Sequence, residues 1–369
     1  MYIEKLSLLY FKNYNSLEIS FSTDINLLTG LNGSGKTNLM DAIFCLCLTK
    51  SFLGATESQL VTHQAPYFSV HGYFQTDHKN HLVQYNFDGK KKSFLVEQES
   101  YTRLSDHIGR FPAVVLTPYD TDMIREGSEE RRKFFDSLFS QAEAQYLQQL
   151  IQYQHFLKQR NALLKNVAEG ARMDYVLLEM YDSHLLQLNK QIAERRQSLI
   201  NKLEPVFRKY YDLLSPEHEV PSLIYSSEVI ETDFADQYKK SLPKDLALQR
   251  TTKGIHKDDY TFLLQQNLVK QYGSQGQQKT FMIALKLAQY TFLKEILGIK
   301  PILLMDDIFD KLDDVRIEKL IRWVKEDFDG QIFISDARPE RSSRLLASGP
   351  KDIRIFNVAN STVTENRHV

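Results

Sequence analysis

The sequence contains little cysteine and no long hydrophobic run. Two cysteines occur among 369 residues, Cys45 and Cys47. Because side chains at this spacing point in different directions on a helix, the two can neither pair with each other nor hold a zinc ion by themselves. The longest apolar runs, such as Ile302–Met305, are far shorter than the ~20 residues that a membrane helix needs. We therefore expect two buried thiols and no transmembrane helix.

The chain also has no excess of either charge. Lys and Arg number 46 against 47 Asp and Glu, for a net charge of −1, so a DNA partner would require a local basic surface. The amino terminus lacks the basic and then apolar pattern of a signal peptide, which favours a cytoplasmic protein. With 42% hydrophobic and 25% charged residues, the composition is typical of a folded protein of two or three units.

The first part of the chain has the pattern of a β-rich lobe around a glycine loop. Alternating apolar and polar runs predict strands over residues 2–9, 17–21, 25–28, 68–74, 81–87 and 93–96. The third strand is followed by the glycine-rich stretch 29–37 and then by apolar residues at helical spacing over 38–48. The order strand, glycine loop, helix is thus predicted here, with a hairpin lobe after it.

A helical segment follows. From Ser128 to Leu214 the chain contains one proline and one glycine, Pro205 and Gly170. Two apolar stripes at helical spacing flank Gly170, which suggests an antiparallel helical hairpin with arms of roughly 40 to 60 Å. An ordinary helical subdomain folded onto the rest of the molecule is the alternative.

The last part of the chain predicts a parallel sheet with helical crossovers. A helix begins at Gly276 and stops at Pro301, Ile302–Met305 has the pattern of a buried strand, and a helix over 315–328 leads to a strand over 331–335. We expect three segments: a first half of an α/β domain over 1–125, an inserted helical arm over 126–245, and the second half of the domain over 246–369.

The glycine loop is a complete phosphate-binding loop (P-loop). It comprises Gly30, Leu31, Asn32, Gly33, Ser34, Gly35, Lys36 and Thr37, between a strand and a helix. Backbone N–H groups would surround phosphate oxygens, Lys36 would reach the β and γ phosphates, and Thr37 would offer a Mg²⁺ ligand. The pattern therefore predicts binding of a nucleoside triphosphate.

Two acids supply the second half of this site. Asp306 and Asp307 follow the apolar strand Ile302–Met305. Asp306 can hold Mg²⁺ through water, and Asp307 would orient the attacking water. A solvated strand end is the alternative, which the phosphate loop makes less attractive. We expect Lys36, Asp306 and Asp307 to be the catalytic residues.

A second anion-binding helix start lies 306 − 274 = 32 residues before the first acid. Ser274, Gln275 and Gly276 open the helix that precedes the acidic strand. Because one nucleotide needs one cradle, this loop is best explained as serving the nucleotide of a second subunit in a two-fold dimer. A helix start without a ligand is the alternative.

These motifs together resemble a known family. The phosphate loop, Ser274-Gln275-Gly276-Gln277-Gln278 and the stretch 305–313 (MDDIFDKLD) are similar to the ABC-type ATPase heads of the SMC and Rad50 superfamily. Within it, the opening stretch 8–14, the stretches 117–136 and 254–259, and the total length resemble the RecF family of bacterial recombination mediators.

The resemblance implies an α/β fold, namely a P-loop ABC-type ATPase head with a β-hairpin lobe and an inserted helical arm. It implies ATP and Mg²⁺ as cofactors, an ATP-dependent homodimer, and binding to gapped or single-/double-strand junction DNA. It also implies RecR and RecO as partners in loading the RecA recombinase during DNA replication, repair and the SOS response. Hydrolysis of ATP would be weak, stimulated by DNA, and would act as a switch.

Several positions depart from the family pattern. Lys12 and Lys257 stand where the family usually has Arg, and Ile255 replaces a Pro. Asp336 occupies the position of the switch histidine of transporter ATPases, and Asp307 is shorter than the Glu of fast ABC ATPases, which favours slow hydrolysis. The ATPase subunit of an ABC transporter is the alternative function. It predicts a Leu-Ser-Gly-Gly-Gln signature and a switch His, and this sequence has neither.

Candidate DNA contacts are numerous but diluted by acids. The basic residues of the insert and the hairpin are Arg131, Arg132, Lys133, Lys158, Arg160, Lys165, Arg195, Arg196, Lys202, Arg208, Lys209 and Lys90–Lys92. Each taken singly is better explained as a solvated charge, and Arg131 and Arg132 could serve the junction of head and arm instead. DNA binding therefore rests mainly on the resemblance.

Overall fold

The computed structural model describes residues 1–76, 79–215, 219–309, 312–337 and 351–366. Asp310 and Lys311 of the acidic motif lie outside the described residues. The chain divides into two compact units. The sheet unit comprises 1–121, 209–218 and 275–369, and the helical unit comprises 122–208 and 219–274. The helical unit is thus an insertion, as expected.

The boundaries of this insertion differ from the expected ones. Residues 246–274, which we expected in the second half of the head, belong to the helical unit. The reason is a sheet that spans the expected boundary: β10 (Asp259–Leu264) pairs along its whole length with β9 (Pro221–Ser226). This pairing joins two segments that are more than 30 residues apart in sequence.

The sheet unit contains a six-stranded sheet with the order β15-β14-β3-β13-β12-β8. Its strands are β3 (Ile25–Thr29), β8 (Ala113–Leu116), β12 (Ile302–Met305), β13 (Ile332–Asp336), β14 (Ile353–Ala359) and β15 (Thr362–Asn366). All neighbours are parallel except the pair β14 and β15. Every residue of β3 and β12 is buried, as in a parallel sheet covered on both faces. The terminal hairpin of β14 and β15 was not anticipated from the sequence.

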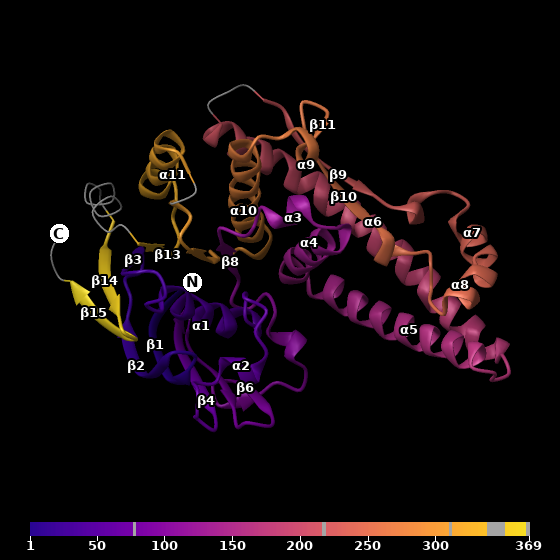
Figure 1. Cartoon of the computed structure of the whole chain (residues 1–369), viewed down its shortest axis with the longest axis horizontal. Coiled ribbons are helices and arrows are strands. Elements are labelled where there is room, and N and C mark those ends of the chain that lie inside the picture. Colours follow the sequence, from indigo (N-terminus) through magenta and orange to yellow (C-terminus); the bar gives the residue numbers. More distant parts are fainter. Residues whose placement is uncertain (77–78, 216–218, 310–311, 338–350, 367–369) are drawn as a thin grey trace. The chain divides into compact units, whose positions relative to one another are not determined.

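A second, antiparallel sheet forms the predicted hairpin lobe, with the order β2-β1-β4-β5-β6-β7. Its strands are β1 (Tyr2–Phe11), β2 (Tyr14–Ser20), β4 (Phe68–Gln75), β5 (Asn80–Phe87), β6 (Lys92–Val96) and β7 (Glu99–Ser100). Helix α1 (Lys36–Leu48) contacts strands of both sheets and is buried almost all round (Figure 1). Cys45 and Cys47 lie in this helix and are buried and free, as expected.

The remaining helices of the sheet unit are α2 (Glu57–Leu60), the 3₁₀ turn Leu104–His107, α10 (Gln275–Leu297) and α11 (Asp314–Glu326). Helix α10 packs on β8. The apolar side of α11, including Ile317, Leu320 and Val324, is buried, as its spacing predicted. No helix in the described part of the chain has the length and apolarity needed to cross a membrane.

The helical unit is built around two long helices. Its elements are α3 (Asp122–Arg125), α4 (Ser128–Ala142), α5 (Ala144–Ala168), α6 (Tyr175–Leu214), α7 (Phe234–Lys240), α8 (Leu242–Leu248), α9 (Val269–Tyr272), β9, β10 and β11 (Asn267–Leu268), with 3₁₀ turns at Glu228–Ile230 and Ile255–Lys257. The last residues of α6, from Lys209 on, belong to the sheet unit.

Helices α5 and α6 form the predicted antiparallel hairpin. Phe156 stacks on His184 with ring centroids 4.3 Å apart. Gln149 of α5 hydrogen-bonds Gln191 of α6 at 3.1 Å. Earlier residues of α5 thus meet later residues of α6, which is the antiparallel arrangement. At ~1.5 Å per residue the two helices are roughly 38 and 60 Å long.

Two buried arginines stabilise the helical unit. Arg196 of α6 donates to Asp136 at 2.8 Å and to Asp258 at 2.7 Å. Arg160 of α5 donates to Asp182 at 2.6 Å and to Asp245 at 2.8 Å. Both side chains are about 1% exposed. Two of the residues that we considered for DNA contact are therefore internal and structural.

Candidate functional site

The predicted site lies at the carboxyl edge of the parallel sheet. Asp336 at the end of β13 is in register with Thr29 at the end of β3, and Met305 at the end of β12 pairs with Ile334. The loop after β3 and the acids after β12 therefore emerge at the same edge. This edge is where ligands bind in open α/β sheets.

The phosphate loop is compact because two of its glycines have no room for a side chain. Gly30 has φ 144°, and a Cβ placed there would lie 2.2 Å from the carbonyl oxygen of Val358 on β14. Gly35 has φ 119°, and its Cβ would lie 2.6 Å from the Asn13 amide and 2.7 Å from the Tyr14 hydroxyl. Glycine is required at both positions by space as well as by backbone conformation.

Asn13 and Tyr14 support this loop from the antiparallel sheet. The Tyr14 hydroxyl donates to the Gly35 carbonyl at 3.0 Å. The Asn13 amide donates to Ser361 at 2.9 Å, and its oxygen accepts from Asn38 at 2.7 Å. Burial raises the pKa of Tyr14, so its hydroxyl remains a donor. The opening stretch 8–14 had marked both residues as family features without indicating this role.

Lys36 is held inside the loop. Its ammonium nitrogen donates to the carbonyl oxygens of Gly30 at 2.8 Å and Leu31 at 3.2 Å. The side chain is 3% exposed and lies 4.0 Å from the nearer carboxylate oxygen of Asp307. These hydrogen bonds hold the ammonium group inside the loop, where it can contact a bound anion.

The loop also contains a buried group that lacks a partner. Within the part of the chain that the structure describes, the Ser34 hydroxyl oxygen is buried and has no hydrogen-bond partner. Such a group costs about 1–3 kcal/mol. Phosphate oxygens would accept this hydroxyl, at the amino terminus of α1 where the helix dipole favours an anion. Asn32 and Gly33 are exposed at the mouth of the loop. The residues present therefore fit a phosphate-bearing ligand.

The loop and the first acid are joined directly. The Thr37 hydroxyl lies 2.9 and 3.0 Å from the two carboxylate oxygens of Asp306. The Ser335 hydroxyl donates to the same carboxylate at 2.7 Å. Burial raises the pKa of Asp306, and the hydrogen bonds from Ser335 and Thr37 oppose that rise. The two residues predicted to bind the metal, Thr37 and Asp306, are in contact.

Asp307 is positioned by the same serine. Its backbone N–H donates to the Ser335 hydroxyl oxygen at 2.8 Å, and that oxygen lies 3.1 Å from the Asp307 carboxylate. Asp307 has φ 44°, a conformation that non-glycine residues adopt at a cost of about 1–3 kcal/mol. Ser335 thus connects both acids. The sequence pattern identified it only as the last residue of a strand, so its role was missed.

The oxygen ligands at this edge fit Mg²⁺. A hydroxyl from Thr37 and a carboxylate from Asp306 are the ligand types that Mg²⁺ uses together with water and substrate phosphates. Among the described residues there is no cluster of three or more His, Cys, Asp or Glu side chains that could hold a metal without such help. The donor set is that of a cation bound with its nucleotide.

The predicted signature residues lie at the start of α10. Ser274 precedes α10, and Gln275 and Gly276 form its first turn. A Cβ at Gly276 would lie 3.4 Å from the guanidinium of Arg316, which pairs with Asp313 in the first turn of α11. The contact described for Gly276 is with α11 and not with the phosphate loop. Its service to a second subunit stays a prediction.

The structure also shows where two positions that depart from the family pattern lie. Lys12 pairs at 2.5 Å with Asp41, which is fully buried in α1 and also accepts from Ser51 and from the Phe52 N–H. Asp41 therefore anchors the turn that follows α1, and Lys12 compensates its buried charge. Asp336, in the position of the switch histidine, is buried at the end of β13.

Comparisons with known proteins agree with this geometry. A family model described as "RecF/RecN/SMC N terminal domain" matches residues 2–110. The DNA replication and repair protein RecF of Cytophaga hutchinsonii is 58% identical over 366 residues, which cover 99% of this chain and 97% of that protein. The protein of the same name from Flavobacterium johnsoniae is 41% identical, covering 97% and 100%.

Solved structures give the same result for the fold. The structure of the recombination mediator protein RecF with ATPrS, in the RecFOR pathway, has a TM-score of 0.88 and 29% identity, covering 99% of this chain and 98% of that one. An Smc head domain from Pyrococcus furiosus, bound to the C-terminal domain of ScpA, has a TM-score of 0.59 and 18% identity, covering 99% and 96%. The ABC-type head fold expected from the sequence is confirmed.

Proposed function

The chain belongs to the RecF family of DNA replication and repair proteins, and from that premise we propose that it is an ATP-switched DNA-binding protein. ATP binding would bring two heads together on gapped or single-/double-strand junction DNA. Slow hydrolysis would release them. The observation that carries this proposal is the connected network of Lys36, Thr37, Asp306, Ser335 and Asp307 at one sheet edge.

ATP is the ligand that this network fits best. The loop offers Lys36, the free hydroxyl of Ser34 and the amino terminus of α1 to phosphate oxygens. A RecF relative of similar fold is described in complex with ATP. Lys36 would hold the β and γ phosphates, and Thr37 and Asp306 would hold Mg²⁺. Bound Mg²⁺ and triphosphate supply a polarised γ-phosphoryl group.

Hydrolysis would depend on Asp307. Its carboxylate is held next to Ser335 and 4.0 Å from the Lys36 ammonium, where it can accept a hydrogen bond from a water at the γ phosphate. An aspartate reaches one methylene less far than a glutamate, and Asp336 replaces a switch histidine. Both features support a weak ATPase, stimulated by DNA, that acts as a switch rather than as a motor.

Dimerisation would complete the site. One nucleotide occupies one phosphate loop, so the second anion-binding helix start, at Ser274, Gln275 and Gly276, is available to a nucleotide held by another copy. Closure of two heads would then depend on the γ phosphate. In this proposal the ATP state sets the residence time on DNA.

The partners follow from the family. RecF relatives are described as DNA replication and repair proteins, and one as a recombination mediator in the RecFOR pathway. We extend this to the present chain: with RecR and RecO it would help to load RecA on single-stranded DNA. Membership in this family removes the transporter ATPase as an alternative.

Analytical ultracentrifugation of the full chain tests the switch. Wild type, Lys36→Met and Ser274→Arg would each be measured with and without Mg-ATP and a gapped duplex. Wild type should dimerise with ATP and hold DNA more tightly, whereas Lys36→Met should lose nucleotide binding. Ser274→Arg should bind ATP but stay monomeric. Ser100→Arg, an exposed serine on β7, is the matched control and should behave as wild type.

Each outcome decides a different part of the proposal. If ATP leaves wild type monomeric with unchanged DNA affinity, the clamp is wrong and the nucleotide site alone remains. If Ser274→Arg dimerises as well as Ser100→Arg, the signature does not act across the interface. If wild type fails to bind ATP, the reading of the phosphate loop is itself wrong.

A further inference from the structure

Nine of the twenty basic side chains of the helical unit are already in ion pairs. Their ion pairs with acids are Arg131–Asp259, Lys133–Glu129 and Lys133–Glu130, Arg160–Asp182 and Arg160–Asp245, Lys165–Glu169, Lys190–Glu194, Arg195–Glu143, Arg196–Asp136 and Arg196–Asp258, Arg208–Glu204 and Lys253–Glu228. A charge that is paired within the protein gains little from a phosphate. The long basic series of the sequence is thus a poor guide to a nucleic-acid surface.

Arg132 is one of the basic residues outside these ion pairs, and its side chain is held by neutral groups. One of its terminal nitrogens, Nη1, donates to the Ser128 hydroxyl at 2.7 Å and to the Asp258 carbonyl at 2.7 Å. Both acceptors are neutral, so the guanidinium is fixed in place without a hydrogen-bonded acid, and the acid that its charge reaches is Glu129, whose pKa it helps to lower. In the described part of the chain its Nε and Nη2 groups have no hydrogen-bond partner. These two groups form the edge that binds a phosphate through two parallel hydrogen bonds.

Two further cations lie next to Arg132. The Asp258 carbonyl that binds Arg132 belongs to the residue after Lys257. On the other side of Lys257, His256 donates a ring N–H to the carbonyl of Thr251 at 3.0 Å, which brings Arg250 to the same place. Lys257 and Arg250 are exposed, and within the described residues their side chains have no acidic partner. Three positive charges therefore lie close together, and within the described residues none of them is in an ion pair.

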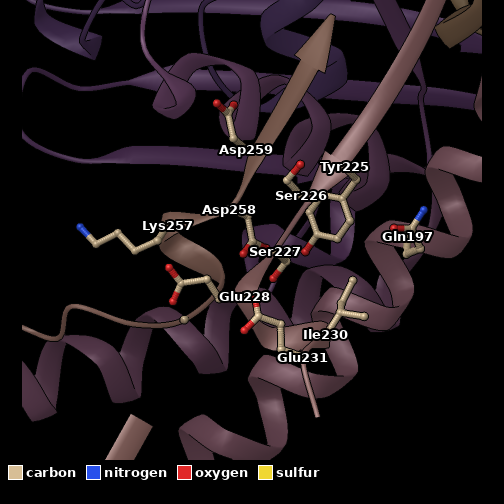
Figure 2. Close-up of a pocket in the computed structure, with 11 residues that line it drawn as sticks. Gln197, Tyr225, Ser226, Ser227, Glu228, Ile230, Glu231, Lys257, Asp258 and Asp259 are labelled. Carbon is tan, nitrogen blue, oxygen red and sulfur yellow. Dashed lines mark hydrogen bonds between the residues drawn. The ribbon is translucent and has the colours of Figure 1, made fainter. Parts of the chain in front are cut away.

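We call Arg132, Arg250 and Lys257 the basic triad. Three of the four acids that line the pocket beside it are paired with other cations, and the fourth, Glu231, accepts a hydrogen bond from Gln237. Asp258 accepts from Arg196, and Asp259 accepts from Arg131. Glu228 accepts from Lys253 at 2.7 Å. Figure 2 shows a pocket of about 600 Å³ lined by one member of the triad, Lys257, together with Asp258, Asp259, Glu228 and Glu231. The Lys257 side chain extends away from the carboxylates of Asp258 and Asp259.

The electrostatics of Lys257 agree with this arrangement. Burial lowers the pKa of Lys257, and the positive charges of Arg250 and Arg132 lower it further. No acid opposes the shift among its causes. The cluster is therefore a site of unfavourable positive potential that a bound polyanion would relieve.

We propose that Arg132, Arg250 and Lys257 form a binding site for backbone phosphates of DNA on the helical unit, an inference that rests on the proposed function. Arg132 supplies a rigid two-pronged edge, and the exposed Arg250 and Lys257 supply mobile charges beside it. An open, exposed cluster of this kind suits a continuous backbone better than an isolated small anion, which needs an enclosing cradle. The contacts are to phosphate, so they give affinity without sequence preference.

The salt dependence of DNA binding tests the site. The full-length double variant Arg250→Gln/Lys257→Gln would be compared with wild type on a gapped duplex in the presence of Mg-ATP, from 50 to 200 mM chloride. Each lost phosphate contact lowers the slope of log K against log salt by about 0.9, so a decrease of about 1.8 is expected. Affinity at the lowest salt should fall at least about tenfold. Both side chains are exposed, so the fold should persist.

The matched control is Lys239→Gln/Lys240→Gln, two exposed lysines at the end of α7 in the same unit. It removes the same charge and should leave the slope within error of wild type. Binding of a fluorescent ATP analogue should be equal in all three proteins. Inorganic phosphate should displace DNA no better than chloride at equal ionic strength.

The outcomes separate this inference from the proposed function. If wild type binds DNA and the Arg250/Lys257 variant retains its slope, the basic triad does not contact DNA and the proposed function stands. An equal loss in the Lys239/Lys240 control would show an effect of net charge and overturn the site. Specific competition by inorganic phosphate would assign the cluster to a free anion. If wild type binds no DNA with or without ATP, the proposed function fails and the inference fails with it.

Discussion

Replacing Ser335 by alanine should impair ATP hydrolysis much more than its small size suggests. The serine hydroxyl donates to Asp306 at 2.7 Å and accepts from the Asp307 N–H at 2.8 Å. The first bond involves a buried carboxylate, and losing such a bond costs about 1.5–3 kcal/mol. If that energy is lost from the transition state, hydrolysis slows by about 10- to 100-fold, since each 1.36 kcal/mol is a factor of ten.

The same substitution should change the pH dependence of hydrolysis. Burial raises the pKa of Asp306, and the hydrogen bond from Ser335 lowers it. Removing that bond lets the pKa rise further, because the bond favours the charged carboxylate. Asp306 must be ionised to hold a cation, so activity is lost as pH falls through its pKa. The acid limb of the ATPase profile should therefore move to higher pH in Ser335→Ala.

Ser22→Ala is the matched control for this prediction. Ser22 is also a buried serine with two hydrogen bonds, donating to the Asp352 carbonyl at 2.8 Å and accepting from the Asp24 N–H at 3.0 Å. It lies just before β3, at the opposite edge of the parallel sheet from the acids. Both variants should lose stability in urea unfolding, but Ser22→Ala should keep the wild-type ATPase rate and pH profile. If Ser335→Ala also keeps them, Ser335 is structural and the reasoning is refuted.

Three further predictions concern stability. Gly30→Ala should destabilise the chain by about 2 kcal/mol or more in thermal unfolding, because its Cβ would lie 2.2 Å from a backbone oxygen. Gly33→Ala, with open space around its Cβ, should cost about 1 kcal/mol from backbone strain alone. Equal losses in the two variants would contradict the crowding at Gly30. Arg196→Met should cost about 3–5 kcal/mol in urea unfolding because Asp136 and Asp258 lose their buried partner. Arg195→Met, which removes a partly exposed pair, should cost less than about 1 kcal/mol. A larger loss of stability in Arg195→Met than in Arg196→Met would show that Arg196 is dispensable. Burial lowers the pKa of His107 from 6.5 to about 4, so the unfolded chain binds the proton at a higher pH than the folded chain does. About 3 kcal/mol of stability is therefore lost as pH falls from 6.5 to 4. The free energy of unfolding should depend less steeply on pH in His107→Gln, and an unchanged slope would count against a neutral buried imidazole.

The phosphate loop could be recognised from the sequence because its chemistry is contiguous. Eight successive residues, from Gly30 to Thr37, carry the backbone turn, the cation and the metal ligand, and the flanking strand and helix are the ones predicted. Asp306 and Asp307 could be placed for a similar reason, since they follow a fully apolar run that could only be a buried strand. Local spacing was sufficient for both.

The groups that support the loop could not be recognised in this way. Val358 crowds Gly30 from a strand near the carboxyl terminus, and Ser335 bonds acids that lie 28 and 29 residues earlier in the chain. Neither residue carries a distinctive side-chain pattern. Strand order in the sheet brings them to the site, and strand order is not visible in a single strand.

The basic residues show most clearly what sequence alone does not reveal. Composition showed that the helical insert is rich in Arg and Lys, and spacing suggested a hairpin of two long helices, with an ordinary helical subdomain as the alternative. Which of those charges remain available was settled by tertiary pairing: Arg160 and Arg196 are buried against aspartates, while Arg132, Arg250 and Lys257 gather without one. The physical reason is the distance along the chain over which each interaction acts. Backbone preferences and apolar periodicity act between near neighbours, whereas the neutralisation of a charge depends on whichever residues the fold places within a few ångströms.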